Sequence, residues 1–125
     1  MRDESRHILV VDDSAIARTS MRIALENVGH RVSEADCGNA ALKHMLGEQP
    51  DLIITDLNMP GMDGIAMVER MNEMGRKCSV LVVTTEASNA LKEAGKALGI
   101  KAWVHKPFQP TAMIQAIKVL THRKG

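Results

Sequence analysis

The sequence contains few aromatic residues and only two cysteines. Aromatic residues make up only 2% of the chain, which argues against a stacking platform for nucleic-acid bases. Cys37 and Cys78 lie far apart and form no CxxC motif, so we expect reduced thiols. No apolar run approaches the roughly 20 residues that span a bilayer, and the charged N-terminus differs from a secretory signal. We therefore expect a cytoplasmic protein without a membrane partner.

The charges are nearly balanced, with a formal net charge of +1 at pH 7. This balance gives no general reason to expect nucleic acid as a partner. A length of 125 residues and a hydrophobic fraction of 45% suffice for one domain with a buried core. We expect residues 1–125 to form that single domain, with methionine and alanine filling the core in place of aromatic rings.

Strand and helix patterns alternate along the whole chain. Short apolar or β-branched runs predict five strands, over residues 7–11, 31–35, 52–55, 79–84 and 102–105. Apolar residues at helical spacing predict five helices, which include residues 17–28, 39–46, 65–71, 87–98 and 111–121. The alternation predicts an α/β fold, in which a doubly wound, five-stranded parallel sheet carries helices on both faces.

The helical spacing also predicts which side chains face the core. In the first helix these are Ala17, Met21, Ala24 and Val28, with Gly29 ending the helix. Asp63 is expected to cap the third helix, which buries Ile65, Val68 and Met71. In the fourth helix they are Ala87, Leu91, Ala94 and Leu98. Gly95 lowers the stability of this fourth helix by about 1 kcal/mol relative to alanine, so we expect it to be the least stable helix.

In a doubly wound sheet, ligands bind at the carboxyl ends of the strands. The polar residues at these ends are Asp12 and Asp13 after the first strand, Asp56 after the third, Thr84 and Thr85 at the fourth, and Lys106 after the fifth. We expect them to meet at the side of the sheet formed by the carboxyl ends of its strands, which we call the carboxyl edge. We expect no comparable set at the opposite side, the amino edge. Taken singly, each has an ordinary explanation as a helix cap, a turn residue, a strand residue or a surface lysine.

Together, these residues predict a metal and phosphoryl site. Carboxylates about 4 Å apart repel each other by roughly 4 kcal/mol per pair, so Lys106 and a divalent cation are needed to balance them. Oxygen ligands suit Mg²⁺, which is usually completed by a phosphate. One carboxylate can then act as a nucleophile and form an acyl phosphate.

The same residues carry a family resemblance. Asp12-Asp13, Asp56 in "TDLNMPGMDG", Thr84 in "VVTTEA" and Lys106 in "VHKPF" resemble the receiver domain of two-component response regulators over essentially the whole chain. The pattern is most similar to the stand-alone, CheY-like receivers of chemotaxis. The resemblance implies the strand order 2-1-3-4-5. It also implies a signalling phosphoacceptor rather than an enzyme, although one that promotes its own phosphorylation and dephosphorylation.

The resemblance assigns a role to each site residue. Asp56 accepts the phosphoryl group from a sensor histidine kinase. Mg²⁺ is bound by Asp12, Asp13, Asp56 and the backbone carbonyl of Asn58, with Asp12 acting through water. Lys106 pairs first with Asp56 and then with the phosphoryl group. Thr84 donates its hydroxyl to a phosphoryl oxygen and shifts its loop.

Further roles concern switching and the lifetime of the phosphoryl group. Trp103 occupies the position of the switch aromatic, and the Lys106–Pro107 peptide bond is implied to be cis. Asn58, Thr85 and Glu86 occupy the positions that tune hydrolysis. Period two along the fifth strand puts Trp103 on the face opposite Lys106. The alternative is a Trp that merely packs under a helix.

The expected output is a change in a protein-binding surface. We expect it to combine the fourth helix, the fifth strand and the fifth helix, around Lys92, Lys96, Trp103, Gln115 and Lys118. Because the chain ends just after the fifth helix, we expect no DNA-binding domain. The implied partners are the kinase, a downstream protein such as a flagellar motor switch, and a phosphatase.

Other classes remain alternatives. A Mg²⁺-dependent aspartyl-phosphate phosphatase or phosphotransferase of the haloacid dehalogenase type would have D-x-D at the first strand, where this chain has Asp12-Asp13-Ser14. A degenerate receiver would bind its partner without phosphorylation. A nucleotide-binding or flavin-binding domain would need a glycine-rich or hydroxyl-rich first loop. The cognate kinase, the output partner, the phosphoryl lifetime and activation-linked dimerisation are left open.

Overall fold

The apolar runs form the sheet that their pattern predicts. The computed structural model describes residues 5–76, 78–85, 88–107 and 109–121. Its strands are β1 (His7–Val11), β2 (Arg31–Ala35), β3 (Leu52–Thr55), β4 (Ser79–Thr84) and β5 (Ile100–His105). All pair in parallel, in the order β2-β1-β3-β4-β5. The predicted fold class and strand order are therefore confirmed.

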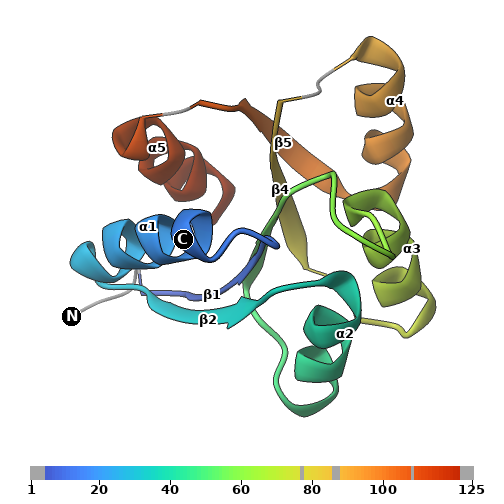
Figure 1. Ribbon diagram of the computed structural model, residues 1–125, viewed down its shortest axis with the longest axis horizontal. Coiled ribbons are helices and arrows are strands. Elements are labelled where there is room, and N and C mark those ends of the chain that lie inside the picture. The colour runs from blue at the N-terminus through green and yellow to red at the C-terminus, as the bar shows by residue number, and fades with distance from the viewer. Residues whose placement is uncertain (1–4, 77, 86–87, 108, 122–125) are drawn as a thin grey trace.

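Helices cover both faces of the sheet. They are α1 (Ala15–Asn27), α2 (Gly38–Gly47), α3 (Gly64–Glu73), α4 (Asn89–Leu98) and α5 (Pro110–Thr121). Figure 1 shows α1 and α5 on one face and α2, α3 and α4 on the other, so the sheet is the middle of three layers. None of the helices described here is long and apolar enough to cross a membrane.

Side chains that alternate along β1 pack into two separate cores, one on each face of the sheet. Ile8 and Val10 of β1 pack in the core under α1 and α5, whereas Leu9 and Val11 pack in the core under α2, α3 and α4. All four side chains are fully buried. A strand covered on both faces must be apolar at every position, which explains the continuous apolar run.

The first helix buries a different residue from the one predicted at its end. Met21 and Leu25 are buried, while Val28 is 48% exposed. The helix ends at Asn27, with Val28 as its C-cap, so Val28 lies beyond the last turn that faces the sheet. Gly29 follows with a φ of 98° and ends the helix as expected.

The third helix begins as predicted, because the Asp63 carboxylate accepts a hydrogen bond from the Ala66 N–H at 2.8 Å. Val68 and Met71 are buried as expected, and Met67 joins them. Ile65 is only half-buried. The predicted buried face is therefore confirmed at Val68 and Met71, while Met67 takes the buried place that was predicted for Ile65.

The fourth helix contacts the sheet through a glycine rather than through alanines. Ala94 is exposed, and Gly95 is the buried residue of α4. A Cβ at Gly95 would lie 2.9 Å from Trp103 Cζ2 and 3.0 Å from Ile100 Cδ1. Glycine thus permits the close approach of α4 to β5. Leu91 and Leu98 flank this contact, while Ala87, also predicted to face the core, lies outside the described residues.

The strand beneath α4 starts earlier than predicted. β5 begins at Ile100 rather than at Ala102, and Ile100 pairs with Val80 of β4. A register shift then makes Ala102 the partner of Leu81, so Lys101 is an extra residue in β5. A period-two pattern hides such an irregularity, which is why the sequence placed the start of the strand too late.

Replacing Gly95 by alanine tests the close approach of α4 to β5. The added methyl group overpacks the contact with Trp103, which costs more than the helix propensity that alanine restores. We expect the free energy of unfolding to fall by about 1 kcal/mol and the Trp103 fluorescence to change. Gly47→Ala is the matched control, since a Cβ there meets nothing within 4 Å. Equal stability of the two variants in urea titrations would contradict the close contact.

Candidate functional site

Asp12 is fixed at the carboxyl end of β1 by the start of α1. Its side chain is only 1% exposed, and its Oδ1 accepts a hydrogen bond from the Ser14 N–H at 2.8 Å. Ser14 in turn caps α1 by accepting a hydrogen bond from the Ala17 N–H. Arg18 Nη1 donates to the Asp12 carbonyl oxygen at 2.6 Å. The neighbouring Asp13 is exposed, so the acidic pair has one buried and one solvent-facing member.

Asp56 leaves the end of β3 on the same edge of the sheet. Its N–H donates to the Val11 carbonyl at 3.0 Å, which ties it to the end of β1. Its Oδ1 accepts a hydrogen bond from the Asn58 N–H at 3.2 Å. Leu57 and Met59 are buried and anchor the loop in the core. The Asp56 side chain is 13% exposed, so it is held in place yet open to a reactant.

Gly64 is a positioning residue that sequence reasoning missed. A Cβ at this position would lie 2.5 Å from the Asp56 carbonyl oxygen and 3.1 Å from Leu57 Cα. The Gly64 N–H donates to the Leu57 carbonyl at 2.8 Å. The start of α3 can therefore press against the Asp56 loop only because it lacks a side chain. The second glycine of "PGMDG", directly after the capping Asp63, is the sequence feature that could have indicated this close approach.

Lys106 connects the two acidic positions. Its Nζ donates to Asp56 Oδ2 at 2.8 Å and to Asp12 Oδ2 at 3.1 Å. Its N–H donates to the Thr84 carbonyl at 2.9 Å, which joins the ends of β4 and β5. Burial opposes the charge of Lys106, but its hydrogen bonds to Asp56 and Asp12 outweigh burial and raise its pKa. The lysine is therefore a fixed cation at neutral pH.

The three acids are close enough to share a cation. One carboxylate oxygen from each of Asp12, Asp13 and Asp56 lies within 4.8 Å of the other two. Lys106 supplies one positive charge for three carboxylates. The remaining excess of negative charge is one that a divalent cation would neutralise. An all-oxygen donor set is the kind that Mg²⁺ takes. The residues present thus fit the metal that the sequence predicts.

The remaining predicted residues lie at or near this edge. Thr84 is buried at the end of β4, while Thr85 and Asn58 are exposed. The Lys106–Pro107 peptide bond is cis, the isomer that the resemblance implies. Glu86 lies outside the described residues.

Trp103 lies on the predicted face of β5. It packs with the core under α2, α3 and α4, whereas Ala102 and Val104 pack with the opposite core. It is half-buried beside Gly95 of α4. Both earlier interpretations of Trp103 fit this position, because it packs under a helix and also faces away from Ala102 and Val104. Its role as a switch stays a prediction.

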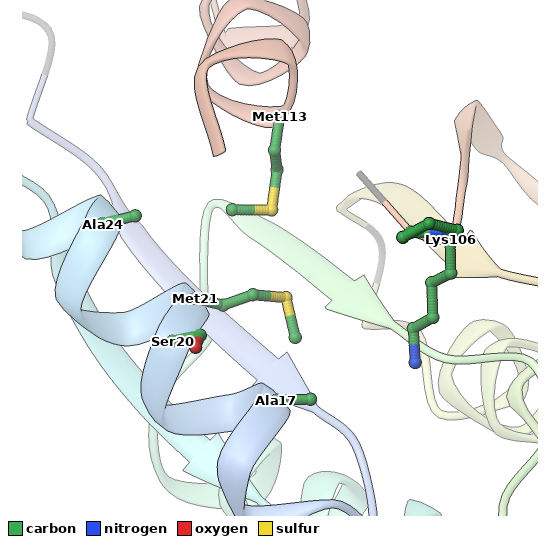
Figure 2. A pocket seen from close by; sticks show the side chains of 7 residues that line it. Ala17, Ser20, Met21, Ala24, Lys106 and Met113 are labelled. Atoms are coloured by element: carbon green, nitrogen blue, oxygen red, sulfur yellow. The ribbon is translucent and has the colours of Figure 1, made fainter. Parts of the chain in front are cut away.

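A pocket of about 420 Å³ lies between α1 and α5, and Lys106 is one of its lining residues. Figure 2 shows Met21 and Met113 pointing toward each other across it, with Lys106 at its side. Its remaining lining includes Ala17 and Ala24. The lining contributed by the described residues is mostly apolar, contains no carboxylate or imidazole, and has Ser20 and Lys106 as its polar members. The carboxylates that could bind a metal lie at the acidic edge, where the Lys106 ammonium is held.

Replacing Lys106 by methionine tests the charge balance. Without magnesium, the change leaves Asp12 and Asp56 without their shared cation, and we expect a loss of about 1–3 kcal/mol in the free energy of unfolding at neutral pH. Because the folded-state pKa of Lys106 is raised, its contribution is complete below the unfolded value of about 10.4 and is lost as the pH rises through the folded value.

The stability difference between wild type and Lys106→Met should therefore be constant around neutral pH and shrink only in strongly alkaline solution. Urea titrations in a chelating buffer measure it. A variant as stable as the wild type at neutral pH would show that the lysine does not balance the acids.

Comparison with known proteins places this geometry in a family. The model of the response regulator receiver domain matches residues 8–118. The transcriptional regulatory protein ResD of Bacillus subtilis is 34% identical over 116 residues, which cover 93% of this chain and 48% of ResD. The chain thus spans about half the length of the curated relatives it matches.

Solved structures agree with the family model. Chemotaxis protein CheY4 of Vibrio cholerae superimposes with a TM-score of 0.86 at 34% identity, covering 93% of this chain and 98% of that one. A CheY-like receiver domain protein of Methanospirillum hungatei also gives a TM-score of 0.86, at 26% identity and 93% coverage of both chains. The chain therefore belongs to the response regulator receiver domain family.

Proposed function

We propose that Asp56 accepts a phosphoryl group from a sensor histidine kinase in a Mg²⁺-dependent reaction. The observation that carries this proposal is the bridge of Lys106 Nζ between Asp56 Oδ2 and Asp12 Oδ2. It holds a partly exposed carboxylate at the sheet edge beside two further acids. In this proposal, residues 1–125 form one receiver domain.

The chain's residues divide the chemistry among them. A carboxylate oxygen of Asp56 attacks phosphorus, the bond from phosphorus to the donor breaks, and an acyl phosphate forms. Mg²⁺, held by Asp12, Asp13, Asp56 and the Asn58 carbonyl, would offset the charge of the phosphoryl oxygens. Lys106 moves its ammonium from the free carboxylate to the phosphoryl group. The Thr84 hydroxyl donates to another phosphoryl oxygen.

The intact site favours a working phosphoacceptor over the alternatives. A degenerate receiver has no need for Lys106 bridging two acids that come from different loops. A phosphatase of the haloacid dehalogenase type has its nucleophile after the first strand, whereas the bridged, partly exposed acid here follows β3. Asn58, two residues after Asp56, and Thr85, which directly follows Thr84, are both exposed. We propose that they, together with Glu86, set the lifetime of the acyl phosphate.

The proposed output surface is formed by α4, β5 and α5. Lys92, Lys96, Gln115 and Lys118 are exposed on its two helices, and Trp103 is half-buried between α4 and the sheet. A phosphoryl group that draws Thr84 toward itself would move the loop that leads into α4. The proposed partner is a protein target, and the likeness to CheY4 supports chemotaxis as its pathway.

Phosphoryl transfer can be tested with a small donor. We expect acetyl phosphate with Mg²⁺ to add the mass of one phosphoryl group to the intact chain, because Asp56 is partly exposed and Lys106 with Mg²⁺ would balance the acidic charge. Asp56→Asn and a chelating buffer should each abolish the gain. Unchanged mass in the wild type, or an equal gain in Asp56→Asn, would refute the proposal. Continuous turnover of the donor without a change in Trp103 fluorescence would instead support a phosphatase.

Hydrogen exchange tests the proposed output surface. Gly95 is the buried residue of α4, whereas α1 buries both Met21 and Leu25. We therefore expect the amides of α4 to exchange faster than those of α1, and we expect beryllofluoride with Mg²⁺ to change the exchange of α4 most. Equal protection of the two helices, without a change on activation, would contradict the prediction.

A further inference from the structure

A second cluster of potential metal ligands lies at the opposite edge of the sheet. His7 begins β1, His44 is in the last turn of α2, and Glu48 is the C-cap of α2. A ring nitrogen from each histidine and a carboxylate oxygen of Glu48 lie within 4.8 Å of one another. The expectation that this edge carries no convergent polar set is therefore wrong.

Local structure brings the three side chains together. His44 and Glu48 are four residues apart and so project from the same side of the helix end. Two hydrogen bonds join the backbone of His7 to Asp51. Asp51 Oδ2 accepts one from the His7 N–H at 2.8 Å, and the Asp51 N–H donates the other to the His7 carbonyl at 2.8 Å. The two imidazole rings are 5.6 Å apart between centroids. The cluster thus joins the end of α2 to the start of β1.

Only one of the two nitrogens of the His7 ring forms a hydrogen bond within the described residues. Nε2 lies 2.8 Å from Ser33 Oγ, a hydrogen bond that fixes the ring. Nδ1 is buried and, among the described residues, has no hydrogen-bond partner. Glu48 Oε2 lies 3.6 Å from Nδ1, which is too long for a hydrogen bond. Since His7 is only 6% exposed, this nitrogen is an unsatisfied polar atom facing a carboxylate.

The doubly protonated, charged form of the His7 ring is disfavoured. Burial lowers the pKa of His7, and the nearby charges of Arg31 and of His44 lower it further, against the opposing influence of Glu48 and Asp51. The ring is therefore neutral at neutral pH, and a neutral imidazole is the form that binds metals. In the tautomer whose Nε2–H donates to Ser33 Oγ, the lone pair on Nδ1 faces the cluster.

We propose that His7, His44 and Glu48 bind a divalent transition-metal ion of the zinc class. Two imidazole nitrogens and one carboxylate leave a fourth tetrahedral position for water. Nitrogen donors favour zinc over Mg²⁺, which prefers oxygen. Ser33 serves as the outer partner that orients the His7 ring.

The surroundings allow an ion to enter. Glu48 is 46% exposed and forms an ion pair with Arg31, whose side chain is 61% exposed. An exposed ion pair contributes little to stability, so Arg31 can turn to solvent when Glu48 binds the ion. The bound ion would clamp the end of α2 to the start of β1 and stabilise the folded chain.

The test uses Zn²⁺ alone as the probe, with the chain free of any affinity tag and with excess Mg²⁺ present. We expect one Zn²⁺ per chain, measured by competition with a chromogenic chelator. Glu48→Gln and His44→Ala should each weaken binding by about tenfold or more. Thermal unfolding should shift upward with Zn²⁺ in the wild type and much less in Glu48→Gln. Co²⁺ should give the visible absorption of a four-coordinate site.

Asp13→Asn is the matched control, because it removes a ligand from the acidic cluster at the other edge. It should bind Zn²⁺ as the wild type does. Equal affinity in Glu48→Gln and wild type, or loss of binding in Asp13→Asn, would overturn the proposal. Glu48 is exposed, so Glu48→Gln is expected to fold, and circular dichroism checks this. The outcome is independent of phosphoryl transfer to Asp56, which has its own test.

Discussion

The bridge from Lys106 to Asp56 and Asp12 is the interaction on which the acidic edge depends. Three carboxylates from two loops would otherwise repel one another and push the ends of β1 and β3 apart. The lysine comes from a third strand, so the charge balance exists only when β1, β3 and β5 are all in place. Lys106 neutralises only part of the charge of the three carboxylates, so the folded chain holds an acidic cluster whose remaining negative charge a divalent ion would neutralise.

The parallel sheet concentrates chemistry at the ends of its strands. The middle positions of β1, β3 and β4 are buried and apolar, so the polar side chains of these strands lie at their ends. At the carboxyl edge, short contacts hold the acidic loops, including the Ser14 N–H on Asp12 and the close approach of Gly64 to Asp56. At the amino edge, the histidine cluster shows the same principle with nitrogen donors. Each edge can therefore acquire a different metal preference from its own residue types.

In the proposed function, the link between the acidic site and the output surface depends on how loosely α4 packs on the sheet. A glycine, rather than a large apolar side chain, forms its buried contact with β5. Leu91 and Leu98 add only partly buried contacts, which is why we expect α4 to shift at low cost. Trp103 lies in this contact, so movement of α4 changes the environment of the tryptophan. The chain is similar in structure to CheY4 and in sequence to about half of ResD, so family membership by itself does not identify the output.

The sequence by itself determined the strands, their fold class and the acidic edge. Period, apolar runs and the rule for ligands in parallel sheets require only local pattern, and they placed Asp12, Asp56 and Lys106 together. Tertiary structure alone decided the features that depend on distance between elements. Examples are the need for glycine at positions 64 and 95, the extra residue in β5, and the meeting of His7 with His44 and Glu48. No local period encodes these contacts, because each joins segments whose separation is fixed only when the helices pack on the sheet.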